Sequence, residues 1–257
     1  MIDTLVKDDT SMIEYANFFA QLNKQNQYQL LNLAITRQFV HDELIDSLGT
    51  KSDSVYVVAN GRVKIFELSA DGKEVILWFC STGELFGFAE TLVASTFSSH
   101  QIHAQACGLS ELLVIDRADF EHFITGNPEA VLPVVQLLGF RLREVSEVLM
   151  DVTSSDVTSR VIRLLYRLGG LYGKSVNNGL RIDLVITHQE MADMIGTSRQ
   201  TVTTVLGDLK RKGLVETEQR KIVIRDMDLM QCLLHRSDTI NVQQDIPANK
   251  RMMETEH

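Results

Sequence analysis

Apolar and polar residues follow different patterns along the chain, and each pattern predicts a different structure. Residues 11–40 contain few helix-breaking residues and are predicted to be helical. From about residue 52 to residue 118, short runs of β-branched and aromatic residues alternate with turn residues, which predicts an antiparallel β-barrel or β-roll. We expect β-hairpins at Asn60-Gly61 and Asp71-Gly72, because both dipeptides favour the positive φ of tight hairpin turns.

The next segment carries a heptad repeat of apolar residues, which we call the heptad stripe. Its seven members are spaced alternately by four and three residues: Val131, Val135, Leu138, Leu142, Val145, Leu149 and Val152. This spacing is typical of the a and d positions of a two-stranded coiled coil. The alternative is an amphipathic helix that packs only on its own domain. We favour a dimer seam because the repeat is strict and the stripe is narrow.

The chain beyond residue 156 changes its pattern again. The apolar spacing predicts a helix over Val157–Leu168 and then a turn at Gly169-Gly170. A short strand over Leu180–Val185 is expected to precede two more helical segments. Residues 237–257 show no periodicity and are predicted to form a mobile tail outside the core.

The strongest motif is a helix-turn-helix between residues 187 and 205. Thr187 and Glu190 have the spacing of a capping box, which begins a helix. Gly196 supplies the positive φ that ends this helix and forms the turn. The buried face of the second helix is expected to carry three apolar residues: Val202, Val205 and Leu206.

The outward residues of such a motif reach DNA, because the N-terminal end of the second helix lies in the major groove. We predict eight DNA-binding residues: Thr187, His188, Ser198, Arg199, Gln200, Thr203, Thr204 and Lys210. Arg can bond bidentately to guanine and Gln to adenine, whereas hydroxyl groups and helix N-terminal amides suit phosphates. Residues 215–224 are predicted to form a β-hairpin, the wing of a winged helix. The alternative is a helical hairpin that only packs.

Charge is distributed unevenly along the chain. The 257 residues carry a net charge of −9, which by itself argues against general coating of nucleic acid. Residues 1–150 contain 10 basic and 20 acidic residues, whereas residues 151–236 contain 13 basic and 10 acidic residues. This contrast indicates two functions, one of which involves phosphates. The alternative is an ordinary solvated surface.

Composition restricts the class of protein. The hydrophobic fraction of 44% and the charged fraction of 23% are typical of globular proteins. No apolar run approaches the ~18 residues of a membrane span, and the N-terminus lacks a secretion signal. The three cysteines, Cys80, Cys107 and Cys232, stand far apart and form no metal or disulfide pattern. We therefore expect a cytoplasmic protein without membrane association or a metal site. Catalytic signatures are missing from the sequence, which predicts that the protein is not an enzyme.

The sequence resembles the cAMP receptor protein/FNR (CRP/FNR) family of bacterial transcription regulators over about residues 25–230. The resemblance rests on five segments: residues 61–66, 71–77, 83–87, 196–202 and 206–215. It implies an α+β fold with an N-terminal antiparallel β-roll of the cyclic-nucleotide-binding type, a long dimerisation helix and a C-terminal winged helix-turn-helix. It also implies a homodimer that binds two-fold symmetric double-stranded DNA and contacts RNA polymerase.

We accordingly divide the chain into four parts: a sensor domain (1–125), a dimerisation helix (126–156), a DNA-binding domain (157–236) and a flexible tail (237–257). The resemblance assigns Arg199 and Gln200 to the base-reading pair of the family. The cAMP receptor has Glu where Gln200 stands and Arg where Thr204 stands, so we expect a different DNA half-site.

The sensor departs from the cAMP-binding pattern, which has Gly-Glu at Gly87-Phe88 and Arg-Ser near Ser98-Ser99. A buried phosphate without a cation is poorly compensated, so we expect little or no cAMP binding. Phe86 and Phe88 face the same way if the segment is extended, either as part of a pocket or as core residues. The candidate effector pocket contains Phe86, Gly87, Phe88, Ala89, Ser98, Ser99 and Arg141.

The sequence also has few of the residues that bind the other effectors of the family. Residues 1–79 contain no cysteine, which argues against an FNR-type iron–sulfur cluster. Ala89 stands where the CO-sensing member has a haem ligand, and we favour ordinary strand histidines at His100 and His103 over haem ligands. The cofactor is therefore left unidentified.

Arg141 has a separate resemblance. The winged helix is also similar to that of the cyanobacterial nitrogen regulator, which binds 2-oxoglutarate, and Arg141 falls on the carboxylate-binding Arg of that protein. The second Arg of that site falls near Ser99 and is missing. The alternative for Arg141 is a solvated residue that flanks the heptad stripe.

These observations predict a homodimeric, sequence-specific transcription regulator whose β-roll senses an unidentified effector other than cAMP. Two alternatives stay open. One is an enzyme with an accessory winged helix. The other is a small-molecule or haem-binding module whose winged helix serves interaction rather than control of transcription.

Overall fold

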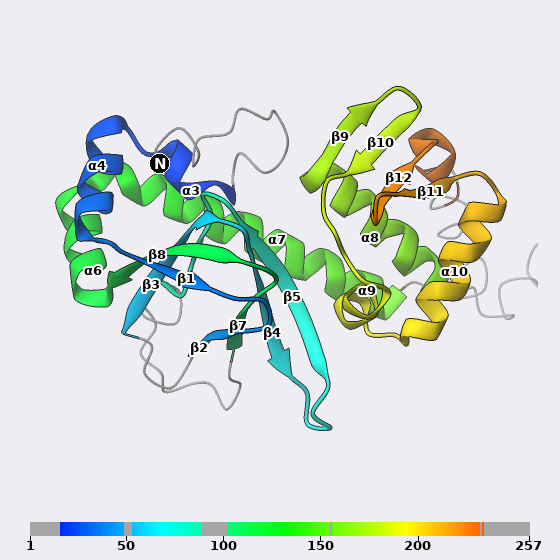
Figure 1. Ribbon diagram of the computed structural model, residues 1–257, viewed down its shortest axis with the longest axis horizontal. Coiled ribbons are helices and arrows are strands. Elements are labelled where there is room, and N and C mark those ends of the chain that lie inside the picture. The colour runs from blue at the N-terminus through cyan, green and yellow to red at the C-terminus, as the bar shows by residue number, and fades with distance from the viewer. Residues whose placement is uncertain (1–15, 49–52, 89–101, 155, 232, 234–257) are drawn as a thin grey trace, which may run out of the picture. The chain divides into compact units, whose positions relative to one another are not determined.

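The structure of the chain is a computed structural model that divides into two compact units, Met1–Ser146 and Glu147–His257 (Figure 1). It describes residues 16–48, 53–88, 102–154, 156–231 and 233. Each unit has its own core and is described by itself. The predicted tail 237–257 lies outside the described residues.

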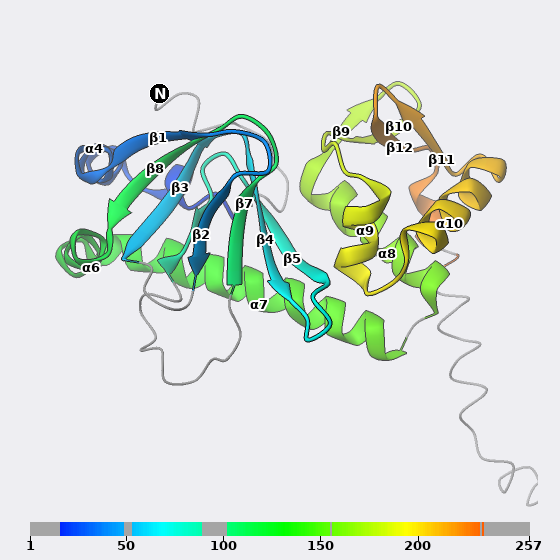
Figure 2. The ribbon, with the colours of Figure 1, turned by 60° about the horizontal axis from the view of Figure 1, so that its bottom comes forward.

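The first unit contains an antiparallel β-roll, as the sequence predicts (Figure 2). Its strands form two four-stranded sheets with the orders β1-β8-β3-β6 and β2-β7-β4-β5. The strands are β1 (Ile35–Phe39), β2 (Leu44–Leu48), β3 (Ser54–Asn60), β4 (Arg62–Leu68), β5 (Glu74–Ser81), β6 (Leu85–Phe86), β7 (Ile102–Ala106) and β8 (Ser110–Asp116).

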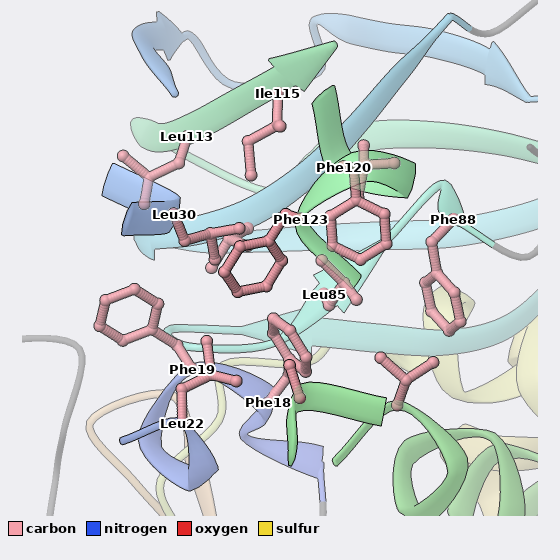
Figure 3. Packing of buried hydrophobic residues seen from close by; sticks show 14 of the residues in the cluster. Phe18, Phe19, Leu22, Leu30, Leu85, Phe88, Leu113, Ile115, Phe120 and Phe123 are labelled. Carbon is pink, nitrogen blue, oxygen red and sulfur yellow. The ribbon is translucent and has the colours of Figure 1, made fainter. Parts of the chain in front are cut away.

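Helices cover the end of the roll and build its core. They are α3 (Phe18–Gln21), α4 (Lys24–Leu33), α6 (Arg117–Gly126), the 3-10 helix η1 (Pro128–Ala130) and α7 (Val131–Ser154). Figure 3 shows the rings of Phe18, Phe120 and Phe123 packing in this core, and all three side chains are almost fully buried. Helix α7 contributes Val134 and Leu137 to the same core, which attaches its first half to the roll.

Two predictions about the N-terminal half are wrong. Residues 11–40 are predicted to be helical, but their described part contains two helices, α3 and α4, and helical structure ends at Leu33, because Ile35–Phe39 pairs with β8 as an edge strand. Gly61 has the expected positive φ of 93°, but β3 and β4 belong to different sheets, so Asn60-Gly61 passes the chain between sheets instead of closing a hairpin. The hairpin at Asp71-Gly72 is confirmed, since β4 and β5 pair along their length.

The second unit is a winged helix. Its elements are α8 (Val157–Tyr172), β9 (Gly173–Val176), β10 (Gly179–Ile182), α9 (His188–Ile195), α10 (Arg199–Arg211), β11 (Val215–Glu218) and β12 (Lys221–Ile224). The sheet has the order β11-β12-β10-β9, and the predicted wing hairpin is confirmed as β11 and β12. Both residues of the wing turn, Gln219 and Arg220, have positive φ angles of 48° and 66°, as two-residue hairpin turns require.

The predicted turn at Gly169-Gly170 is wrong, because α8 continues to Tyr172. A Cβ atom at Gly169 would lie 3.1 Å from the Leu180 side chain. The glycine therefore allows the β9–β10 hairpin to approach the helix closely. The strand predicted at Leu180–Val185 is shorter and ends at Ile182. Across the described residues, the helices are either too short or too polar to cross a membrane.

Candidate nucleic-acid interface and effector site

The helix-turn-helix begins with the capping box that the sequence predicts. The Thr187 hydroxyl accepts a hydrogen bond from the Glu190 amide at 3.1 Å, and the Glu190 carboxylate accepts one from the Thr187 amide at 2.7 Å. Gly196 ends α9 in the left-handed conformation, with φ 63° and ψ 51°. Ser198 then caps α10 by accepting a hydrogen bond from the Thr201 amide. The predicted capping box and the predicted turn at Gly196 are both confirmed.

The two helices pack through one apolar face each. The buried residues are Met191, Ala192 and Ile195 of α9 and Val202, Val205, Leu206 and Leu209 of α10. This packing leaves the polar face of α10 outside. Five of the predicted DNA-binding residues are exposed there: Arg199, Gln200, Thr203, Thr204 and Lys210. The other three, Thr187, His188 and Ser198, lie at the N-terminal ends of α9 and α10.

A hydrogen-bond chain joins the two helices on this face. His188 Nδ1 lies 2.8 Å from Thr203 Oγ1, and the Thr203 hydroxyl donates to the Arg199 carbonyl oxygen at 2.9 Å. The Thr204 hydroxyl donates in the same way to the Gln200 carbonyl oxygen at 3.1 Å. Partial burial, together with the positive charges of Lys210 and Arg199, lowers the pKa of His188 below its usual value.

The basic residues of the second unit fall into two groups. Within the part of the chain that the structure describes, the side chains of Arg199 and Lys210 make no hydrogen bond or ion pair. Arg211, in contrast, pairs with Asp208, and Arg225 pairs with Glu216 at 2.5 Å and with Glu218 at 2.7 Å. The unpaired group is the one that can meet DNA phosphates or base edges without breaking an existing contact.

Sequence reasoning missed two sets of residues that hold this unit together. Arg160 of α8 donates to the Ile195 carbonyl oxygen at 2.9 Å and so binds the C-terminal end of α9, just before the Gly196 turn. Asp151 is buried and pairs with Arg167 at 2.5 Å and with Arg163 at 3.3 Å. The sequence does show that Arg163 and Arg167 are one helical turn apart and so share a helix face. It does not show that Asp151 is their common partner.

The phenylalanines of the candidate effector pocket lie in the core. Phe86 stacks on Tyr56 with ring centroids 4.9 Å apart, whereas Phe88 belongs to the other core cluster, beside Phe18 and Phe120 (Figure 3). Phe86 and Phe88 are expected to face the same way only in an extended segment, and the segment is not extended, because Gly87 has a φ of 83° and turns the chain between them. Ala89, Ser98, Ser99 and His100 lie outside the described residues.

Arg141 lies in a buried charged cluster, so the solvated alternative is wrong. Its Nη1 atom is 2.6 Å from Glu144, and its Nη2 atom pairs with Glu84 and lies 3.8 Å from the Cys80 sulfur. The guanidinium also lies 5.2 Å from the Trp78 ring centroid. The side chains of Arg141 and Glu84 are only 11% and 2% exposed, so Arg141 is almost fully occupied by its own chain.

Burial sets the direction in which the pKa values of two members of this cluster, Glu84 and Cys80, are shifted. It raises the pKa of Glu84 to about 7, although the positive charge of Arg141 acts in the opposite direction. Burial also raises the pKa of the Cys80 thiol, which therefore stays protonated at neutral pH.

In the described residues, His, Cys, Asp and Glu side chains form no group that could hold a metal ion. His103 packs against the Phe66 ring at 5.2 Å.

The heptad stripe is unused within the single chain. All seven of its residues are exposed, from 40% at Val131 to 69% at Leu142. The core-facing residues of the first half of α7 are Val134 and Leu137, which lie between the stripe positions. The helix therefore attaches to the first unit through one face and leaves the stripe free on another.

Comparisons with known proteins agree with both units. The model of the family described as cyclic nucleotide-binding domain matches residues 36–127, and that of the Crp-like helix-turn-helix domain matches residues 159–233. The chain is 30% identical over 183 residues to the cyclic AMP receptor protein of Thermus thermophilus. The aligned residues cover 71% of this chain and 80% of that protein.

Two further comparisons extend the match. The chain is 28% identical over 192 residues to the global nitrogen regulator of a Synechocystis strain, which spans 75% of this chain and 85% of that protein. A solved structure of a CooA mutant from Carboxydothermus hydrogenoformans is 23% identical, has a TM-score of 0.70 and covers 90% of this chain and 99% of its own. At that identity the structure supports the fold alone.

Proposed function

Because this chain belongs to the CRP/FNR family of transcription regulators, we propose that it is a homodimer that binds two-fold symmetric DNA under the control of its β-roll. The family assignment makes the chain a DNA-binding regulator with a sensing domain of the cyclic-nucleotide-binding type, and not an enzyme. The enzyme alternative is thereby set aside. The symmetry, the site residues and the effector belong to the proposal.

The exposed residues at the N-terminal end of α10 support the proposal that the protein binds DNA. Arg199 and Gln200 stand in its first turn, where side chains of their length reach base edges in the major groove. We assign Arg199 to a guanine and Gln200 to an adjacent base. Thr187, His188, Ser198 and Lys210 flank them and are assigned to the DNA backbone, and Thr203 and Thr204 complete the same exposed face.

The exposed heptad stripe supports the dimer. Contiguous apolar residues on a soluble protein mark an interaction surface, and a strict heptad spacing fits a second copy of the same helix. A two-fold dimer presents two recognition helices and therefore reads a two-fold symmetric site. Contact with RNA polymerase is part of the proposal, since members of the family act on transcription.

The effector is proposed to be something other than cAMP. The position at which the cAMP-binding pattern has Glu is occupied by Phe88, whose ring is buried in the core. Arg141 is engaged by Glu84 and Glu144, so an anionic effector would have to displace a carboxylate from it. Calorimetric titration with cAMP is expected to give no micromolar binding, and a micromolar dissociation constant would contradict this part of the proposal.

The division of the chain into residues 1–125, 126–156 and 157–236 is retained as a proposal. It assigns the sensor, the dimerisation helix and the DNA-binding domain to consecutive segments, and the two family models match on either side of α7.

Selection of DNA sites from a random library with the full-length protein tests the proposed DNA-binding function directly. An enriched sequence with inverted half-sites is expected, and failure to enrich any sequence would contradict it.

A further inference from the structure

We infer that Thr203 recognises the methyl group of a thymine in the DNA site, and that His188 is the positioning residue that orients Thr203 for this contact. The inference rests on the proposed function, because it concerns the base preference of the same recognition helix. It adds one specificity-determining residue to Arg199 and Gln200.

First, the Thr203 hydroxyl uses its single hydrogen in a bond within the protein. A hydroxyl group has one hydrogen to donate and can accept through its lone pairs. Thr203 donates its hydrogen to the Arg199 carbonyl oxygen at 2.9 Å. His188 Nδ1, at 2.8 Å, must then donate to the Thr203 oxygen. The hydroxyl hydrogen is therefore used within the protein and is not offered to a base or a phosphate.

The second step is the position of the methyl group. The Cβ atom of Thr203 carries only a hydroxyl, a methyl group and a hydrogen. Two contacts hold the hydroxyl toward the preceding turn of α10 and toward the N-terminus of α9. Because the residue is exposed, the methyl group is the part of this side chain that the helix presents to a ligand.

The third step is the chemistry of the major groove. Thr203 lies one helical turn after Arg199 and so shares its face of the recognition helix. Thymine is the base that displays a methyl group in the major groove, and Thr methyl groups recognise it by apolar contact. An oriented methyl group beside a guanine-reading arginine therefore favours thymine at a neighbouring position.

Thr204 shows why His188 matters. Its hydroxyl also donates one turn back, to Gln200 at 3.1 Å, but the described residues provide no second partner for it. Thr204 can turn its hydroxyl toward DNA at the cost of one hydrogen bond, whereas Thr203 would lose two. His188 reaches Thr203 because the capping box places it in the first turn of α9. The lowered pKa of His188, caused by burial and by Lys210 and Arg199, favours the neutral ring.

The experiment replaces thymine by uracil, which lacks the methyl group, one position at a time in a site selected with the full-length protein. At one thymine of each half-site, the replacement is expected to weaken wild-type binding about fourfold, the effect of one buried methyl group of ~0.8 kcal/mol. Thr203→Ser keeps the hydroxyl and removes the methyl group. It is expected to show the same loss with thymine and no further loss with uracil.

Variants at the neighbouring contacts separate orientation from general structure. Thr203→Val keeps the methyl group and should retain the preference for thymine. His188→Leu cannot donate to Thr203 and should reduce the preference, whereas His188→Asn retains a donor and should restore it. Thr125→Ser is the matched control, because Thr125 is also exposed and donates one turn back, to the Glu121 carbonyl oxygen at 2.9 Å, in the first unit. It should keep the full fourfold preference.

The outcomes distinguish this inference from the proposed function. A selected site at which no thymine is sensitive to uracil, or a Thr203→Ser variant that still loses affinity with uracil, overturns the thymine contact and leaves DNA binding intact. A preference that is unchanged in His188→Leu overturns the role of His188. If no DNA site can be selected, the proposed function fails, and the inference fails with it.

Discussion

Two arginines of this chain show how the same side chain serves opposite purposes in the two units. Arg141 of the first unit is buried, pairs with Glu84 and Glu144 and lies over the Trp78 ring. Arg199 of the second unit is exposed, and its side chain has no hydrogen-bond or ion-pair partner among the described residues. A ligand can reach Arg199 without breaking a contact, whereas a ligand for Arg141 must replace a carboxylate.

The difference shows that an arginine in a candidate site supports ligand binding only if its side chain is not already paired within the protein. Both were singled out in the sequence as ligand-binding candidates, one for an effector and one for DNA. Breaking a buried ion pair leaves an uncompensated charge, whereas changing an exposed and unpaired residue has little effect on folding. Stability measurements therefore sort structural arginines from those that are available to a ligand.

The largest expected effect is on Arg141→Met. The substitution leaves Glu84 buried without its partner, and we expect a loss of ~3–5 kcal/mol in the free energy of unfolding. Trp78, the single tryptophan of the chain, lies beside Arg141 and provides a fluorescence signal for urea unfolding of the first unit.

Two variants control this measurement. Arg141→Met combined with Glu84→Gln should recover most of the lost stability, because the ionisable carboxyl group that is left buried without a cation is removed as well. Arg199→Met should stay within about 0.5 kcal/mol of the wild type. Equal unfolding curves for Arg141→Met and the wild type would mean that the cluster contributes nothing to folding.

Leu142 sharpens the comparison, because it follows Arg141 directly but is 69% exposed. In the proposed dimer, Leu142→Asp puts two carboxylates on the seam. We expect the dimer to be weakened by ~3 kcal/mol, or about a hundredfold in its dissociation constant. Sedimentation velocity over a range of concentrations measures this. Met150→Asp is the matched control, since Met150 is 63% exposed and lies outside the heptad stripe. A monomeric wild type would refute the seam.

The pH dependence of the first unit tests the charged cluster without removing Arg141. Burial raises the pKa of Glu84 from 4.5 to about 7, so the folded chain holds this proton more tightly than the unfolded chain does. The stability that this proton contributes is fully present below about pH 4.5 and is lost as the pH rises to about 7.

The measurement compares the wild type with Glu84→Gln by urea unfolding between pH 4 and 8, again with Trp78 fluorescence. The free energy of unfolding of the wild type should fall relative to that of the variant as the pH rises through this range. A difference between the two proteins that does not change with pH would show that Glu84 has an ordinary pKa.

Local signals explain which parts of the structure could be predicted from the sequence. The capping box at Thr187, the turn at Gly196 and the apolar spacing of α10 act within a few residues, and the structure contains all of them. The hairpin at Asp71-Gly72 belongs to the same class, because one turn joins neighbouring strands.

Contacts between distant segments explain the remainder. The strand Ile35–Phe39 is stabilised by pairing with β8, which no local pattern reveals. Arg141 and Glu84 are 57 residues apart, so their pairing depends on how α7 packs on the roll. Phe86 and Phe88 enter different core clusters because of the backbone angle at Gly87. Apart from the turn at Gly87, the misjudged positions are therefore those whose environment is set by tertiary packing.

The most direct test of the central claim, that the N-terminal face of α10 reads DNA sequence, compares Arg199→Ala with Lys210→Ala. Binding to the selected site and to scrambled DNA is measured at several salt concentrations. Arg199→Ala should lose ~1–3 kcal/mol on the selected site and much less on scrambled DNA. Lys210→Ala should weaken both DNAs alike and reduce the salt slope by ~1. If Arg199→Ala weakens both DNAs equally while Lys210→Ala affects only the selected site, the assignment of the recognition face is wrong.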